Sequence, residues 1–247
     1  MPRDPRTDYP GATHHIFVRG VARSAIALDD QDYKRTLRFL ERTVSRFDVV
    51  CHAWCLLPNH SHFLLTSRKA NISPAMQWFG SRTAQTFNER YDRSGHLYQG
   101  RFGSRLVESD RYFLELTRYI ALNPLRAGLC ESADDWLWSS YAATAGSQAP
   151  PRLSPRLLDT RTLAEKLGSA GDYAEWVAAG VDETFLDDDG FPRLPPRPSL
   201  ASLVVDDVIG EVAIAHFRHG YPIAAIAKHL GVSRSQLSRR LAALREA

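Results

Sequence analysis

The sequence predicts an α+β protein in which a ferredoxin-like antiparallel sheet with helices on one face is followed by an all-α C-terminal domain. Two observations predict this class. Up to about residue 125, segments with strand and helix patterns alternate in the order β-α-β-β-α-β-α, and the first six form a split βαβ arrangement. After residue 200 the only periodicity is helical.

Each element follows from a local signal. Strands are predicted where short runs of β-forming residues stop at glycine or proline; these runs cover residues 14–19, 48–57, 60–66 and 94–107. Helices are predicted where apolar residues recur at helical spacing after a capping residue; these cover residues 32–47, 74–90 and a segment from about 110 to Pro124. Pro58-Asn59 joins two strands, which favours a hairpin.

Composition changes predict three parts: a catalytic domain over residues 10–145, an acidic, Pro-rich linker over 146–199 and a helical DNA-binding domain over 200–247. Residues 1–130 carry 19 Lys and Arg against 12 Asp and Glu, whereas residues 131–199 carry 6 against 12. The positive net charge of residues 1–130 and of the C-terminal residues from 200 favours binding to a polyanion, whereas the negative net charge of residues 131–199 does not. Within the linker, residues 162–181 show weak helical periodicity.

The overall composition excludes several protein classes. Apolar residues make up 44% and charged residues 24% of the 247 residues, as in ordinary globular proteins. No apolar run reaches the roughly 18 residues of a membrane helix, and the polar N-terminus lacks a secretory apolar region. Three cysteines are too few for a disulfide scaffold. We therefore expect a cytoplasmic protein without a membrane partner.

Two pairs of residues carry the chemistry. His60 and His62 lie two apart on a predicted strand, so both imidazoles point to one face, about 6–7 Å apart, and can share a metal ion. Tyr119 and Asn123 lie four apart on a predicted helix and therefore share a face. Asparagine offers a neutral oxygen that suits Mg²⁺ or Mn²⁺, and tyrosine offers a nucleophile.

These motifs resemble those of a known family. The segment LLPNHSH, the stretch GHLYQGRFGSRLVESDRYFLELTRYIALNPLRAGL and the sequence WLWSSY are similar to the HUH single-tyrosine transposases, and more narrowly to the REP-associated tyrosine transposases. The resemblance covers about residues 10–145. Ser61 departs from the pattern, because the residue between the two histidines is usually apolar. It should face away from the metal, so we expect no effect on ligation.

The resemblance implies an HUH endonuclease fold and a reaction. His60, His62 and Asn123 would hold Mg²⁺ or Mn²⁺, and Tyr119 would be the nucleophile. The family cuts single-stranded DNA at hairpins of repetitive palindromic elements through a 5′-phosphotyrosine link, and it can rejoin strands. The chain would thus be a transposase, active as a monomer or a homodimer.

Alternatives exist for some of these residues. Tyr112 lies seven residues before Tyr119 on a similar face and is a second candidate nucleophile, although a core aromatic is favoured. Cys51 and Cys55 together with the histidines suggest a zinc site. In a regular strand both cysteines share a face about 13 Å apart, which one ion cannot easily bridge. Four arginines are candidate phosphate contacts, and a solvated face explains each about equally well; they are Arg19, Arg101, Arg105 and Arg126.

The tail resembles a helix-turn-helix domain. In residues 223–241, Gly231 fits a left-handed turn and Ser233 a helix cap, while Ala227 is small where two helices cross. The second helix would place five polar residues near the major groove of duplex DNA; they are Arg234, Ser235, Gln236, Arg239 and Arg240. A dimerisation hairpin is the other interpretation of this segment.

Three functions therefore remain open, of which the weakest is RNA processing, because ferredoxin-like sheets also occur in RNA-binding proteins. The first is a metal-dependent, single-strand-specific DNA endonuclease and strand transferase. The second is a catalytically inactive, domesticated DNA-binding regulator that uses only the tail. The presence of all four key residues favours the enzyme.

Overall fold

The computed structural model describes residues 7–147, 157–181, 198–205, 208–219 and 221–243. These form two compact units. The first contains residues up to 108 together with 120–162, and the second contains residues 109–119 together with those from 163 onward. The division therefore runs through one helix, between Tyr119 and Ile120. It does not follow the boundaries at 145 and 199, which stay a prediction.

The first unit is built on a four-stranded antiparallel sheet in the order β2-β3-β1-β4. The strands are β1 (Ala12–Arg19), β2 (Val49–Leu56), β3 (His60–Ser67) and β4 (Gly103–Leu106). β2 and β3 form the hairpin predicted at Pro58-Asn59. The fourth strand is much shorter than the predicted segment of 94–107. Gly95 has a φ of +88° before it, a conformation that interrupts extended structure.

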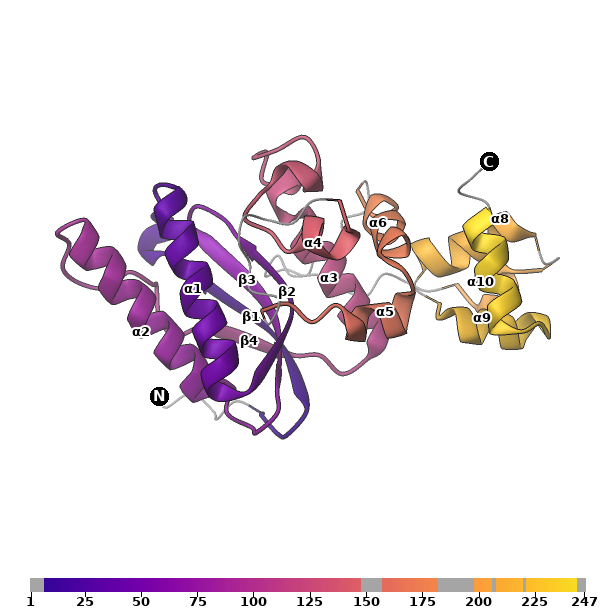
Figure 1. Ribbon diagram of the computed structural model, residues 1–247, viewed down its shortest axis with the longest axis horizontal. Coiled ribbons are helices and arrows are strands. Elements are labelled where there is room, and N and C mark those ends of the chain that lie inside the picture. The colour runs from indigo at the N-terminus through magenta and orange to yellow at the C-terminus, as the bar shows by residue number, and fades with distance from the viewer. Residues whose placement is uncertain (1–6, 148–156, 182–197, 206–207, 220, 244–247) are drawn as a thin grey trace. The chain divides into compact units, whose positions relative to one another are not determined.

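Helices α1 (Asp30–Phe47) and α2 (Ile72–Arg90) lie side by side and cover one face of the sheet (Figure 1). Asp29 caps α1 by accepting hydrogen bonds from two backbone amides of its first turn. Phe63 of β3 and Phe79 of α2 meet edge to face at 5.3 Å within this core. The ferredoxin-like α+β class expected from the sequence is thus confirmed.

A β-bulge changes the faces of β2. The pairing with β3 shifts between Cys51 and Ala53, because His52 is an extra residue in the strand. Cys51 consequently faces the helices, together with Trp54, whereas Cys55 pairs with His62 on the other face. The expectation that the two cysteines share a face is wrong, because it assumed an uninterrupted strand. This correction also separates Cys51 from the histidines.

The tryptophan-rich segment after residue 135 protects the edge of β2. The backbone of Trp138 accepts a hydrogen bond from Leu56, and the hydroxyl of Ser140 accepts one from Trp54. The ring of Trp138 stacks on Tyr33 of α1 at 4.8 Å. This motif therefore has a structural role, because it closes an otherwise open sheet edge. Short helices flank this segment: η2 (Ala133–Asp135) comes before it and α4 (Tyr141–Ala145) follows it.

Helix α3 (Asp110–Arg126) begins after Ser109, whose hydroxyl accepts a hydrogen bond from the Tyr112 amide. The sequence predicted that Pro124 would end it, and the helix runs only two residues further. Proline has no N–H, so it deletes one hydrogen bond of the last turn. A hydrogen bond from Ala127 to the carbonyl of Asn123 closes this turn.

In the described residues, the second unit packs six further helices and one π-helical turn with the first half of α3. The helices are α5 (Arg161–Leu167), α6 (Ala170–Ala178), α7 (Leu200–Leu203), α8 (Ile209–Ala213), α9 (Ile223–Leu230) and α10 (Arg234–Ala243), with η3 (Ile214–Arg218) after α8. The helix predicted over 162–181 is split, because Gly168 has a φ of +123° and Ser169 caps a new helix. Residues 148–156 and 182–197 of the predicted linker lie outside the described residues.

The predicted turn between the last two helices has the expected geometry. Gly231 ends α9 in the left-handed conformation, with a φ of +67°. Ser233 and Gln236 form a reciprocal cap at the start of α10, through hydrogen bonds of 2.9 and 3.2 Å. Ile226 and Leu237 are fully buried between the helices. α9 and α10 are therefore a packed pair joined by a tight turn.

We predict that Gly231→Ala destabilises the second unit by about 1 kcal/mol, because a side chain disfavours the left-handed region. Chemical denaturation followed by circular dichroism measures this change. Gly100→Ala is the matched control, since its Cβ would meet open space and its φ is not positive. Equal stability of the Gly231→Ala variant and the wild type would contradict the assigned turn.

Candidate functional site

The face of the sheet opposite α1 and α2 carries a group of histidines. His15 and Phe17 on β1 face the same side as His60 and His62 on β3, because Phe17 pairs with His62 and Arg19 with His60. The rings of His60 and His62 lie 5.1 Å apart, centre to centre. The sequence prediction that these two imidazoles share a face is therefore confirmed.

His60 has partners on both sides of its ring. Its Nδ1 lies 2.7 Å from Oδ1 of Asn59, an atom that can only accept, so the proton sits on Nδ1. Nε2 then carries the lone pair that a metal would require. Asn123 is buried in the last turn of α3, and its side chain lies close enough to His60 to raise the pKa of that imidazole. The third predicted ligand is thus a neighbour of His60.

His62 is held by a histidine that the sequence argument did not single out. Nδ1 of His62 lies 3.0 Å from Nε2 of His15, and the centres of the two rings are 5.2 Å apart. Both side chains are buried. The sequence shows a histidine in the first strand, but whether it lies next to His62 depends on the β1–β3 register. Sequence periodicity does not give this register.

Burial keeps the three imidazoles neutral. Desolvation, helped by the positive charge of Arg19, lowers the pKa of His60 to about 4. Desolvation and the nearby Arg105 lower the pKa of His15 to about 3. Burial also holds the pKa of His62 well below its usual range. Neutral imidazole is the form that a metal site requires, so His60 and His62 would be available to a metal at pH 7.

The donor set fits a divalent cation. Within the part of the chain that the structure describes, no group of three or more His, Cys, Asp and Glu could hold a metal ion. A third ligand must therefore come from another residue type, and Asn123 supplies an amide oxygen next to His60. Two imidazoles and one amide would form a neutral set of three ligands that leaves coordination positions open.

We predict that the protein loses stability as the pH falls from about 6.5 to 4. The unfolded chain takes up protons on these histidines near pH 6.5, whereas the folded chain resists them, so falling pH favours unfolding. Each fully affected histidine contributes on the order of 1 kcal/mol per pH unit in this window. Urea denaturation at pH 7 and pH 5 measures the loss, and unchanged stability would contradict the assigned burial.

Tyr119 lies on α3 one turn before Asn123 and is buried, with 8% of its surface exposed. In a helix, residues four apart share a face about 6 Å apart along the axis. Tyr112, the alternative nucleophile, is eleven residues before Asn123 and thus about 16 Å from it along the same axis. Helix geometry favours Tyr119 over Tyr112 as the residue that accompanies Asn123.

The four candidate arginines of the first unit differ in whether they lie near the histidines. Arg19 is exposed beside His60, and Arg105 pairs with His15 across β1 and β4, so both flank the histidines. Arg126 is the half-buried last residue of α3. Arg101 is apart from them, because it lines a cavity of about 720 Å³ formed by α2 and residues 95–102.

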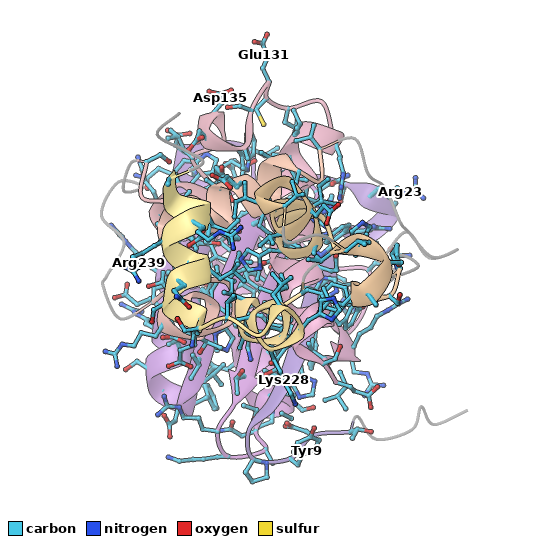
Figure 2. The ribbon with its side chains drawn as sticks, turned by 90° about the vertical axis from the view of Figure 1, so that its right-hand side faces the viewer. Tyr9, Arg23, Glu131, Asp135, Lys228 and Arg239 are labelled. Carbon is cyan, nitrogen blue, oxygen red and sulfur yellow. The ribbon has the colours of Figure 1, made fainter. Side chains whose placement is uncertain are left out.

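The five candidate contacts in the tail lie on α10. Arg234, Ser235, Gln236 and Arg239 are exposed, and Arg240 is half-buried. Figure 2 shows Arg239 extending away from this helix. The Gln236 side chain also accepts a hydrogen bond from the Ser233 amide, so it contributes to the cap. The exposed residues leave α10 with a polar, positively charged outer surface.

The antiparallel sheet that carries two neighbouring histidines is the arrangement expected of an HUH transposase. A comparison with known protein families gives a matching result. Residues 9–123 match the family described as Transposase IS200 like. This segment is thus similar to the IS200-like transposases.

Two similar proteins point to a narrower group within these transposases. A protein of Haemophilus influenzae named as a REP-associated tyrosine transposase is 27% identical over 113 residues, which are 41% of this chain and 64% of that relative. A solved structure of a REP-associated tyrosine transposase bound to a REP hairpin covers 64% of this chain and 94% of its own. Its TM-score of 0.51 at 18% identity shows a shared fold. The resemblance to REP-associated tyrosine transposases is thus confirmed.

None of the helices in the described part of the chain is long and apolar enough to cross a membrane.

Proposed function

We propose that the chain is a metal-dependent, single-strand-specific DNA endonuclease and strand transferase that cuts hairpin-forming repeat DNA through a phosphotyrosine at Tyr119. The observation that carries this proposal is the proximity of the His60 and His62 rings, 5.1 Å apart on one face of the sheet, with the Asn123 side chain near enough to raise the pKa of His60. The IS200-like family and a relative bound to a REP hairpin support the choice of DNA hairpins as substrate.

His60, His62 and Asn123 would hold Mg²⁺ or Mn²⁺. A bound divalent ion supplies charge neutralisation at a non-bridging phosphate oxygen and aligns the phosphorus for in-line attack. The three side chains contribute no negative charge, so they would leave the full positive charge of such an ion available to the phosphate. Arg19 and Arg105 add positive charge on the same face of the sheet.

Tyr119 would supply the nucleophile. A bond forms between its phenolic oxygen and phosphorus, and the bond from phosphorus to the 3′ oxygen breaks. The phenol proton passes through solvent to the departing oxygen, which leaves as a 3′-hydroxyl. A free phenol is only about 0.1% ionised at pH 7, so Tyr119 depends on an activated phosphate. Because the phosphotyrosine conserves the bond, attack by a 3′-hydroxyl can reverse the step and join strands.

An adduct assay tests the proposal. The full chain is incubated with labelled single-stranded hairpin DNA from repeats of the host genome, with and without Mg²⁺. We expect a covalent protein–DNA adduct that requires the divalent ion and a single-stranded substrate. Duplex binding without an adduct on any such strand would instead support the inactive regulator.

The tail would add affinity for duplex DNA through α10. We predict that Arg239→Ala weakens binding to a mixed-sequence duplex about 3- to 10-fold and lowers the slope of log affinity against log salt by about 1, because one phosphate contact is lost. Fluorescence anisotropy across a salt series measures both values. Arg38→Ala, which removes an exposed arginine of α1, is the control. Equal salt slopes for the Arg239→Ala variant and wild type would argue for the dimerisation hairpin.

A further inference from the structure

We propose that His15 is a positioning residue that fixes the orientation and proton arrangement of His62, so that Nε2 of His62 faces the metal. This inference rests on the proposed function, because it assigns His62 as a ligand. It identifies a residue outside the predicted ligand set and gives it a defined task.

The ring of His15 contacts His62 and is shielded from solvent. Nε2 of His15 lies 3.0 Å from Nδ1 of His62, and their rings are tilted by only 25°. His15 has no exposed surface, and His62 is 2% exposed. Two buried imidazoles at hydrogen-bond distance must divide their protons so that one donates and the other accepts.

Phe17 packs against this pair from β1. Its ring centre lies 5.7 Å from that of His15 and 6.4 Å from that of His62. Gly103 of β4 makes room for the ring, because a Cβ at that position would come within 2.0 Å of it. The rings of the pair thus have an aromatic neighbour that restricts their rotation.

The chemistry of coordination decides which imidazole donates. If His62 binds through Nε2, its proton resides on Nδ1, and His15 must accept that proton at Nε2. Metal-binding histidines usually donate their second N–H to an acceptor in this way, which fixes the ring and makes it a better ligand. Asn59 does the same for His60 by accepting from Nδ1. Each candidate ligand of β3 therefore has its own acceptor.

The chain offers a matched comparison residue. His14 precedes His15 on β1, is equally buried and faces the helices, where it contacts Asp8 and Ser104. His14→Gln and His14→Met should perturb packing about as much as the same changes at His15. A loss of metal binding that occurs only at position 15 therefore reports on the hydrogen bond to His62.

The test is the affinity of the full chain for Mn²⁺ without DNA, measured by the paramagnetic resonance of free Mn²⁺. His15→Met, which cannot accept a strong hydrogen bond, should weaken binding about 10- to 100-fold. His15→Gln, which can place an amide oxygen near the position of Nε2, should restore it to within about threefold of wild type. Both His14 variants should bind Mn²⁺ like wild type.

Each outcome decides the inference. If the His15→Met variant binds Mn²⁺ as tightly as wild type, or if the Gln variant is no better than the Met variant, the positioning role is wrong while the metal site stands. If the wild type itself binds no Mn²⁺, the proposed function fails together with the inference. Histidine ¹⁵N NMR of the wild type is independent of any variant, and a His62 proton on Nε2 in the Mg²⁺-loaded protein would also overturn it.

Discussion

The Tyr119→Phe variant should form no covalent adduct with hairpin DNA, with a loss on the order of 10³-fold or more. The change removes one hydroxyl from a buried side chain of α3 and leaves the ring that packs there. Without the hydroxyl no bond to phosphorus can form, and loss of a nucleophile usually removes nearly all of the chemical acceleration. Gel electrophoresis under denaturing conditions after incubation with labelled single strands measures the adduct.

Tyr112→Phe is the control for this prediction, because it makes the same change two helical turns earlier in α3. It should leave adduct formation within a few-fold of wild type. Hairpin binding without cleavage should be retained in both variants, which separates loss of chemistry from loss of folding. An adduct of normal yield in the Tyr119→Phe variant would exclude Tyr119 as the nucleophile.

The His60→Ala variant should lose both Mn²⁺ binding and adduct formation, with affinity reduced by more than about 100-fold. With only three candidate ligands, the loss of one cannot be compensated by another, and this histidine is the one whose pKa the neighbouring Asn123 side chain affects. Calorimetric titration with Mn²⁺ and the adduct assay across Mn²⁺ concentrations measure the two effects.

The exposed His96 of the loop before β4 is the matched control, because His96→Ala removes an imidazole outside the histidine face. It should titrate with Mn²⁺ like wild type. Undiminished Mn²⁺ affinity in the His60→Ala variant would place the ion elsewhere. Partial rescue of its adduct at high Mn²⁺ would instead show a weakened site of the kind proposed.

The helices and strands could be predicted from the sequence wherever the local sequence pattern agrees with the tertiary structure. The strand and helix patterns up to Arg126 gave the element order, because each element has one buried face and a cap or turn at its end. The turn between α9 and α10 could also be predicted from the sequence, because Gly231 and Ser233 favour it by their own conformational preferences. His60 and His62 could be paired because only strand periodicity was needed.

Other features depend on contacts that periodicity does not encode. The bulge at His52 exchanges the faces of Cys51 and Cys55, and nothing in the local residues specifies the register shift. The role of His15 follows from the β1–β3 register, which is set by the whole core. The grouping of residues 109–119 with the C-terminal helices reflects Trp176, whose indole donates to Leu114 and lies 3.9 Å from the guanidinium of Arg118.

The most direct test of the phosphotyrosine mechanism is to identify the residue that carries DNA in the wild-type adduct. Trypsin separates the two candidate tyrosines, because cleavage after Arg111, Arg118 and Arg126 puts Tyr112 and Tyr119 in different peptides. Mass spectrometry of a nuclease-trimmed adduct should find the nucleotide on the peptide of residues 119–126. A nucleotide on the peptide of residues 112–118, or strand cleavage with no nucleotide on any peptide, would contradict the mechanism.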